Sequence, residues 1–135
     1  MFEYKHFVKL ADTDSAGVLF FANQFRIIHY AFETFLHDNG ISVRNMLYND
    51  NCSLPLTHAE ADFNLPIHVS DELVIRISVN EYSKTSFTLL YTINNKFGLC
   101  GTAKTVHFAM DLNNGNKTNL PDYIFELLHK YYSNE

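Results

Sequence analysis

Hydrophobic and polar residues alternate over the first ten positions of the chain. The residues of the more apolar face are Phe2, Tyr4, His6, Val8 and Leu10. Glu3, Lys5 and Lys9 fall on the opposite face, where only Phe7 interrupts the polar pattern. A period of two residues is typical of a half-buried strand, so the pattern predicts a strand over residues 2–10.

The period changes at Asn23, where apolar residues begin to recur at spacings of three and four. The residues in this pattern are Phe25, Ile28, Phe32, Phe35 and Leu36. They predict a long helix that ends at Asp38-Asn39-Gly40, because an Asn-Gly pair just after the last periodic residue is a common helix terminus. The many aromatic side chains lead us to expect this helix deep inside the protein.

The second half of the chain is a run of strand-like segments separated by turns. The segments are residues 54–63, 72–82, 86–93 and 99–110. A connector over residues 41–53 precedes them, with one helical turn expected at 43–47, and a short helix from Pro121 to about Tyr132 follows them. Several strands beside one apolar helix predict an α+β fold with an antiparallel sheet. No repeat or linker interrupts the pattern, so we expect a single domain over residues 1–135.

Composition and charge narrow the class of protein. The chain has 135 residues, 47% of them hydrophobic and 19% charged, which is ordinary for a globular domain. A net charge of −5 without any run of Lys and Arg disfavours a nucleic-acid surface. No segment resembles a signal peptide or a membrane span. Cys52 and Cys100 are far apart in apolar surroundings, so we expect buried, reduced thiols in a cytoplasmic protein.

The segment Asp12-Thr13-Asp14-Ser15-Ala16-Gly17 lies between the first strand and the long helix, and it is the best candidate for chemistry. A carboxylate near a helix N-terminus lies beside backbone N–H groups that stabilise negative charge. Such a pair could attack a carbonyl and hold the resulting oxyanion. Two alternatives compete: an Asp that only caps a turn, and a metal-binding pair on one strand face. The metal interpretation is weak because no further oxygen ligands follow.

Two further groups of polar residues have both a chemical and a structural interpretation. His29, Glu33 and His37 are spaced by four residues along one side of the helix, which suits a metal or a proton relay but equally a solvated face. Of these, Glu33 and His29 would be the chemical candidates. A second set alternates along one strand, where it either lines a cleft or faces water: His58, Glu60 and Asp62.

Lys84-Thr85-Ser86 offers one charge and two hydroxyl groups at the start of a strand. These groups suit a bound phosphate, but a solvated hairpin turn is the more common structure for such a sequence. The sequence lacks the G-x-S-x-G, P-loop and G-x-G-x-x-G motifs, so a serine hydrolase or a nucleotide-fold enzyme has no support.

The stretch from Asp12 to Phe20 resembles the Asp-x-Asp-x-x-Gly signature of the 4-hydroxybenzoyl-CoA-type thioesterases, which have the hotdog fold. Asn23-Gln24-Phe25, Leu54-Pro55-Leu56 and the segments around Pro66 and Lys84 extend this resemblance over nearly the whole chain. Within that family, the segments 10–18, 23–25 and 54–58 are most similar to the 1,4-dihydroxy-2-naphthoyl-CoA hydrolases of phylloquinone and menaquinone biosynthesis. The resemblance implies an antiparallel sheet wrapped around one long central helix.

The resemblance also implies which residues act on the substrate. Asp14 matches the catalytic aspartate, as nucleophile or general base, and the backbone N–H of Phe21 would polarise the thioester carbonyl. Related enzymes carry a phenol at the Phe21 position, but a backbone contact does not require it. The remaining implied substrate contacts are Gly17, Ser53, Leu54, His58 and Lys84. No metal and no cofactor beyond the CoA of the substrate is expected.

The resemblance further implies a homodimer or homotetramer, in which residues 53–60 of one subunit face Asp14 of another. Lys84 is almost alone as a basic residue in its segment, so CoA phosphates would need basic groups from elsewhere, including a neighbouring subunit. Two alternatives to the aromatic acyl-CoA hydrolase stay open. One is a thioesterase for other acyl-CoA substrates, and the other is a non-catalytic module that binds acyl groups.

Overall fold

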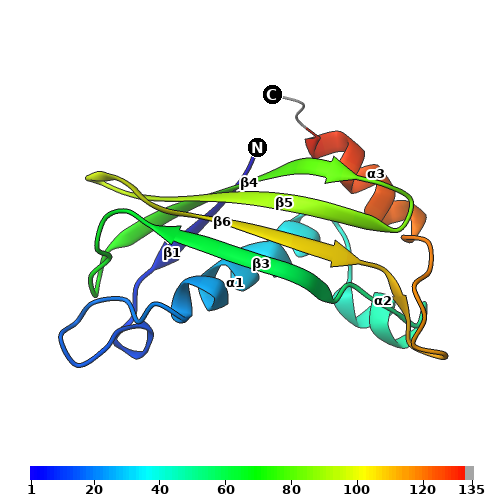
Figure 1. The fold of residues 1–135 in the computed structure, drawn as a ribbon, viewed down its shortest axis with the longest axis horizontal. Coiled ribbons are helices and arrows are strands. Elements are labelled where there is room, and N and C mark those ends of the chain that lie inside the picture. Colours follow the sequence, from blue (N-terminus) through cyan, green and yellow to red (C-terminus); the bar gives the residue numbers. More distant parts are fainter. Residues whose placement is uncertain (133–135) are drawn as a thin grey trace.

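The computed structural model describes residues 1–132, and its main feature is a five-stranded antiparallel sheet packed over a long helix (Figure 1). The strands are β1 (Phe2–Phe7), β2 (Cys52–Ser53), β3 (Leu56–Phe63), β4 (Glu72–Tyr82), β5 (Ser86–Asn95), β6 (Gly98–Phe108) and β7 (Met110–Asp111). The helices are η1 (Leu10–Asp12), α1 (Asn23–Asp38), α2 (Val43–Tyr48) and α3 (Asp122–Tyr131). Residues 133–135 of the expected domain lie outside the described residues.

The main sheet has the strand order β1-β4-β5-β6-β3, and every neighbouring pair is antiparallel. One face of β4 supplies a row of buried side chains: Leu73, Ile75, Ile77 and Val79. This strict alternation is what places one face of a strand against a core. The strand β3 forms one edge of the sheet, and seven of its eight residues are exposed.

The helix α1 packs across the apolar face of the sheet. Its buried apolar residues are Ile27, Ile28, Ala31, Phe32, Phe35 and Leu36, which follow the spacing read from the sequence. The ring of Phe35 lies 5.2 Å from that of Phe2 on β1, and the ring of Phe32 stacks on His107 of β6 at 4.7 Å. The opposite face, with Arg26, Tyr30 and Glu33, is exposed. In the single chain the helix therefore lies at the surface with one face in the core, and not deep inside the protein as expected.

The helix α3 covers one end of the core through Ile124, Leu127 and Leu128. The two short strands β2 and β7 pair with each other beside the main sheet, and the sequence pattern did not separate them from their neighbours. Both cysteines are free thiols and buried, as expected. None of the described helices has the length and hydropathy needed to cross a membrane.

Most predicted elements occur within a few residues of their expected bounds. The first strand is the main exception, because β1 ends at Phe7 and a turn of 3₁₀ helix occupies residues 10–12. Leu10, expected on the buried face, is 74% exposed. Pro55 separates β2 from β3, so the strand expected from Leu54 begins at Leu56.

Candidate active site

The segment between β1 and α1 is organised around Asp12, which is buried. Its Oδ2 lies 3.0 Å from Nε2 of His6 and accepts a hydrogen bond of 2.9 Å from the backbone N–H of Lys9. Its backbone carbonyl accepts from the N–H of Phe20 and from the side-chain amide of Asn23. Asp12 therefore connects the end of β1, the loop and the start of α1.

The environment of Asp12 favours its charged form. Burial by itself raises the pKa of this carboxyl group, but the hydrogen bonds from Lys9 and His6 and the nearby positive charge outweigh it, and the pKa is lowered. The Asp12 carboxylate therefore has a structural role, because its Oδ2 already interacts with His6 and with the N–H of Lys9. The metal-binding alternative placed Asp12 and Asp14 on one strand face, and this geometry does not occur, because Asp12 is the last residue of a 3₁₀ turn.

Asp14, two residues later, is exposed in the loop between η1 and α1. Its Oδ1 accepts hydrogen bonds from the backbone N–H groups of Ala16 at 2.9 Å and Val18 at 3.2 Å. Its own N–H donates to the carbonyl of Val18 at 2.8 Å. Within residues 1–132, no hydrogen bond engages Oδ2. One oxygen of the carboxylate thus orients the group, and the other is open to a substrate or a water molecule.

Gly17 closes this loop in a conformation that other residues rarely adopt. Its φ is +76°, in the left-handed region, and its N–H donates to the carbonyl of Asp14. The backbone around the carboxylate therefore depends on a glycine at this position.

We expect Gly17→Ala to lower the free energy of unfolding by about 1 kcal/mol through backbone strain and, by shifting Asp14, to lower kcat by about 10-fold. Gly115→Ala is the matched control, because Gly115 has a φ of +74° in the loop after β7, where an added Cβ meets nothing within 4 Å. Gly115→Ala should lower the free energy of unfolding by a similar amount and leave kcat unchanged. Urea unfolding and steady-state kinetics measure both effects, and equal loss of kcat in the two variants would contradict the role of Gly17.

Phe21 lies just before α1 and carries a free backbone donor. The N–H groups of Leu19 and Phe20 donate to the carbonyls of Ile67 and Asp12, but that of Phe21 has no acceptor in the described part of the chain. It lies at the positive end of a helix of 16 residues with no acidic residue in its first turn. A free N–H at a helix N-terminus is suited to hold a developing oxyanion.

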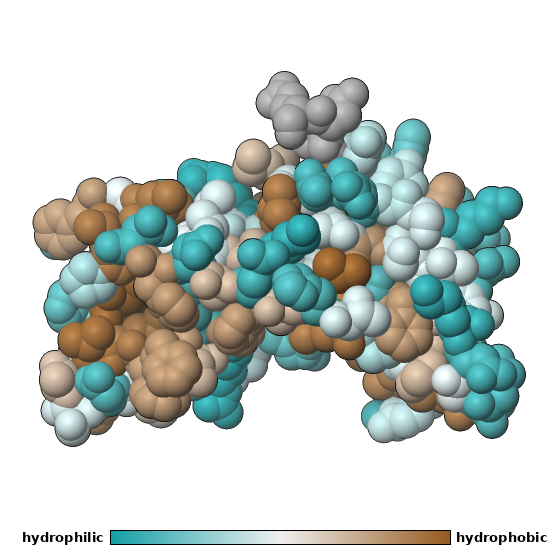
Figure 2. All heavy atoms as spheres, in the orientation of Figure 1, coloured by the Kyte–Doolittle hydropathy of each residue, from teal (hydrophilic) through white to brown (hydrophobic). Residues whose placement is uncertain are grey.

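A recess of about 300 Å³ adjoins Phe21 between the loop and the segment after β3. Most of the residues that line it are apolar: Val18, Leu19, Phe21, Phe63, Leu65, Pro66 and Ile67. Figure 2 shows apolar side chains gathered at this end of the molecule, where Phe21 is 65% and Phe63 is 55% exposed. An exposed apolar surface of this kind is typical of a ligand or protein interface.

Gln24, which the sequence analysis did not single out, also lines the recess and is buried. Its Nε2 lies 3.2 Å from the carbonyl oxygens of Asp62 and Thr102, so it holds α1 against β3 and β6. Its amide fills the space over Gly101, where a Cβ would lie 3.0 Å from Nε2. A polar residue at a core-facing position of an amphipathic helix was the signal that could have identified it.

Three other predicted contact residues lie around the link between β2 and β3: Ser53 ends β2, Leu54 lies between the two strands, and His58 is in the first half of β3. The Asp14 loop adjoins the opposite end of β3, where Val18 and Leu19 line one recess with Phe63 (Figure 1). The structure therefore does not bring the three predicted residues to Asp14 within one chain. The backbone of Leu54 is held by His107, whose Nδ1 lies 2.9 Å from the carbonyl oxygen of Leu54. The exposed side chains of His58 and Glu60 pair at 3.0 Å on the outer face of the sheet.

The His107 ring is enclosed between two aromatic rings and is neutral at physiological pH. It stacks on Phe32 at 4.7 Å and on Phe87 at 4.8 Å, and its Nε2 lies 3.1 Å from Oγ1 of Thr105. Burial is the main cause that lowers its pKa from 6.5 to about 4. Within residues 1–132, no carboxylate forms an ion pair with this ring, and only the carbonyl of Leu54 would favour its protonated form.

We expect this buried ring to make the protein less stable in mild acid. The unfolded chain binds a proton at His107 near its ordinary pKa while the folded chain does not, so stability falls as the pH drops from 7 to about 4.5, by about 2 kcal/mol. Urea unfolding at the two pH values measures the loss. His107→Gln should remove most of this slope, and His37→Gln, at an exposed histidine of α1, should retain it. An unchanged slope in His107→Gln would contradict the assignment.

Lys84 lies in the turn between β4 and β5, near α3 and far along the sheet from the Asp14 loop (Figure 1). The Oγ of Ser83 accepts hydrogen bonds from the N–H groups of Thr85 and Ser86, which is the hairpin turn considered in the sequence analysis. Within one chain, Lys84 and Asp14 therefore cannot contact the same small group.

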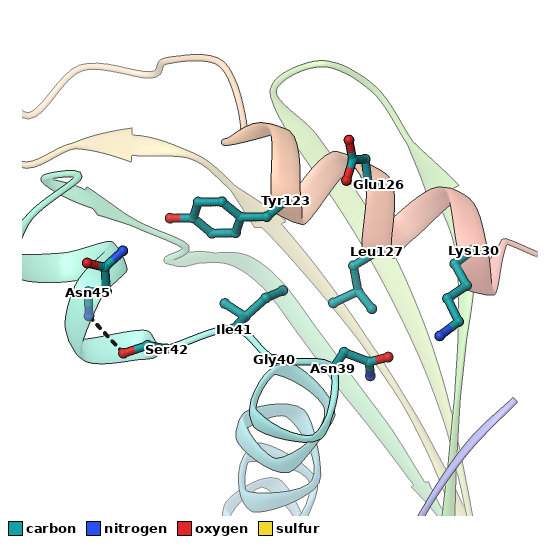
Figure 3. Close-up of a pocket in the computed structure, with 9 residues that line it drawn as sticks. All are labelled: Asn39, Gly40, Ile41, Ser42, Asn45, Tyr123, Glu126, Leu127 and Lys130. Carbon is teal, nitrogen blue, oxygen red and sulfur yellow. Dashed lines mark hydrogen bonds between the residues drawn. The ribbon is translucent and has the colours of Figure 1, made fainter.

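The remaining polar clusters do not form a second site in the described residues. His29, Glu33 and His37 are exposed along α1, and His58, Glu60 and Asp62 face outward from β3. Among residues 1–132, no group of three His, Cys, Asp or Glu side chains is placed to hold a metal ion. A cavity of about 440 Å³ between the end of α1, α2 and α3 contains none of the predicted site residues (Figure 3).

Comparison with known proteins shows the family of this chain. A family model described as the thioesterase-like superfamily matches residues 8–128. The 1,4-dihydroxy-2-naphthoyl-CoA hydrolase of Nostoc punctiforme is 32% identical over 127 residues, which cover 94% of this chain and 86% of that protein. The protein of the same name from a Synechocystis species is 34% identical over 122 residues, covering 89% of this chain and 88% of the relative.

Similarity extends to the solved structures. The crystal structure of a 1,4-dihydroxy-2-naphthoyl-CoA thioesterase from Synechocystis matches with a TM-score of 0.89 and 32% sequence identity, over 95% of each chain. The solved structure and this chain therefore share the same fold over nearly their whole length.

Proposed function

The chain belongs to the thioesterase-like superfamily, and on that premise we propose that it hydrolyses an aromatic acyl-CoA thioester, 1,4-dihydroxy-2-naphthoyl-CoA, in phylloquinone or menaquinone biosynthesis. The relatives that carry this name match nearly the full chain. One structural observation supports the chemistry most directly: Asp14 presents an open carboxylate oxygen on the loop that leads to the free N–H of Phe21. We place this reaction in the cytoplasm, without a cofactor other than the CoA of the substrate.

The proposed reaction uses two groups of this chain. Asp14 attacks the thioester carbon, or it removes a proton from a water molecule that attacks. In either route the carbonyl oxygen gains negative charge and accepts a hydrogen bond from the N–H of Phe21. The C–S bond then breaks and CoA leaves as a thiolate, which takes up a proton. In the nucleophilic route, water hydrolyses the acyl-aspartyl anhydride, which releases the acid and restores the carboxylate.

We also propose that the enzyme works as a homodimer, or as a tetramer built from such dimers, joined through the β3 edge. This edge is long, exposed and unpaired in the described chain, which is a state that folded proteins seldom leave open. An antiparallel pair of β3 strands about a two-fold axis would place the beginning of one strand beside the end of the other. Ser53, Leu54 and His58 of one subunit would then lie near the recess at Phe21 of its partner.

In this assembly, Lys84 of a neighbouring subunit could contact a phosphate of the CoA. Since Lys84 and Asp14 are far apart in one chain, a contact between Lys84 and a CoA phosphate would have to come from a neighbouring subunit. The hollow that Figure 2 shows between the end carrying residues 10–21 and the end carrying α2 leaves room for such a neighbour.

The proposed function is tested by measuring thiol release from a panel of acyl-CoA thioesters, including 1,4-dihydroxy-2-naphthoyl-CoA, 4-hydroxybenzoyl-CoA and short- and medium-chain substrates. We expect the naphthoyl substrate to have the highest kcat/KM. Highest kcat/KM on an aliphatic thioester would favour the broader thioesterase. Tight binding of acyl-CoA without cleavage of any member would favour the non-catalytic module. Light scattering on the same sample tests the assembly, for which a monomer would be the contrary result.

A further inference from the structure

Tyr4, His6 and Asp12 form a small network at the start of the Asp14 loop, in which Tyr4 is half-buried and the other two are buried, and which takes no part in the proposed reaction. His6 of β1 is 7% exposed and Asp12 is 6% exposed. Nδ1 of His6 lies 3.3 Å from the hydroxyl of Tyr4, and its Nε2 lies 3.0 Å from Oδ2 of Asp12. None of these three side chains belongs to the groups assigned to the substrate.

The network is connected to both reacting groups by very short paths. Asp12 is two residues from Asp14, whose Oδ1 is held by Ala16 and Val18. The carbonyl of Asp12 accepts the N–H of Phe20, which is the residue before Phe21. A shift of Asp12 would therefore move the carboxylate and the proposed oxyanion donor relative to each other.

The end of the loop is held by residues 67–69, because the N–H of Leu19 donates to the carbonyl of Ile67 and the N–H of Val69 donates to the carbonyl of Gly17. The beginning of the loop is held mainly at Asp12. Leu10 is 74% exposed, and Ser15 and Ala16 are also exposed, so few of its side chains are packed in the core. The position of the loop depends instead on hydrogen bonds, several of which involve Asp12. His6 is the partner that anchors the Asp12 side chain to β1, and β1 is part of the rigid sheet.

We propose that the buried His6–Asp12 pair is a positioning device that fixes the Asp14 carboxylate relative to the N–H of Phe21. This proposal rests on the proposed thioesterase function. The pair touches no substrate and acts only through the loop. Reacting groups must be held to within about half an ångström, so a pair that sets their spacing contributes to kcat rather than to binding.

The test compares two substitutions of His6. His6→Gln keeps an N–H donor close to the position of Nε2, whereas His6→Leu removes it. We expect His6→Leu to lower kcat by about 10- to 100-fold with little change in KM, because a misplacement of about 1 Å can cost two orders of magnitude. We expect His6→Gln to stay close to the unchanged protein. In an Asp14→Asn background, His6→Leu should cause no further loss.

A lower kcat in His6→Leu could come from general destabilisation of the protein or from displacement of Asp14, and the experiment must distinguish the two. Ile124→Ala, in the core under α3 and away from the loop, is the control for general destabilisation, and each variant is assayed well below its unfolding temperature. Ile124→Ala should keep kcat. If His6→Leu lowers only the melting temperature and leaves kcat unchanged, or if it raises KM alone, the positioning role is wrong.

A second measurement does not depend on activity. Amide hydrogen exchange at Ala16 and Val18, which donate to Asp14, should accelerate in His6→Leu but not in His6→Gln or Ile124→Ala. If the unchanged protein cleaves no thioester, the proposed function fails, while the exchange rates still show whether the pair holds the loop. Unchanged exchange in His6→Leu would overturn the proposal on its own.

Discussion

Asp14→Asn is expected to lower kcat by about three orders of magnitude or more, as removal of a nucleophile or general base does in other hydrolases. Asparagine keeps the size of the side chain and an oxygen that can accept from the N–H groups of Ala16 and Val18. The loop should therefore keep its shape while the negative charge is lost. The loss of kcat then reports chemistry rather than folding.

The measurement is thiol release from 1,4-dihydroxy-2-naphthoyl-CoA under saturating conditions. Asp38→Asn, at the exposed C-terminal end of α1, is the matched control, because it removes the same charge away from the loop. It should retain full activity, and both variants should unfold at nearly the same temperature as the unchanged protein. Full activity in Asp14→Asn would show that another group performs the chemistry.

Phe21→Pro is the second substitution with a large expected effect, because proline has no backbone N–H. In other acyl-transfer enzymes, loss of one oxyanion donor lowers kcat by about 100- to 1000-fold, and we expect a loss in that range. The N–H of Phe21 has no acceptor within residues 1–132, so its removal breaks no hydrogen bond of the fold. Proline is also well tolerated at the start of a helix.

Phe21→Leu separates the backbone from the ring. It keeps the N–H and an apolar side chain at the recess, so kcat should stay within a few-fold of the unchanged protein. Steady-state kinetics of Phe21→Pro and Phe21→Leu measure the loss of kcat, and thermal unfolding shows whether either variant is destabilised. Equal loss in Phe21→Leu and Phe21→Pro would mean that the phenyl ring, and not the N–H, carries the effect.

The α1 helix shows how much of the fold the sequence could predict. Its apolar spacing and the Asn-Gly terminus predicted residues 23–38, and the structure has Asn23–Asp38, followed by Gly40 with a φ of +81°. The strand β4 occurs exactly over the expected Glu72–Tyr82. These features depend on local periodicity and turn chemistry, which are visible in a short stretch of sequence.

The end of the first strand could not be predicted from local periodicity. Alternation suggested that the strand continued to Leu10, but the hydrogen bonds of Asp12 with Lys9 and His6 turn the chain into a 3₁₀ helix. The burial of Asp12 and the exposure of Asp14 follow from that turn. From spacing alone the two acids were equivalent. The small residues that follow Asp14, which let a substrate approach the backbone, and the resemblance to a family both favoured Asp14.

By itself, the sequence determined the order of the elements, the ends of the long helix and the family of the chain, since each of these depends on neighbouring residues or on short motifs. The tertiary structure decided which acid is exposed, which polar side chain holds the helix to the sheet, and which predicted residues share a site. The amide of Gln24 meets carbonyl groups 38 and 78 residues away, and His107 meets Leu54 across 53 residues. Contacts at such separations depend on how the whole sheet closes over α1, and no local pattern encodes them.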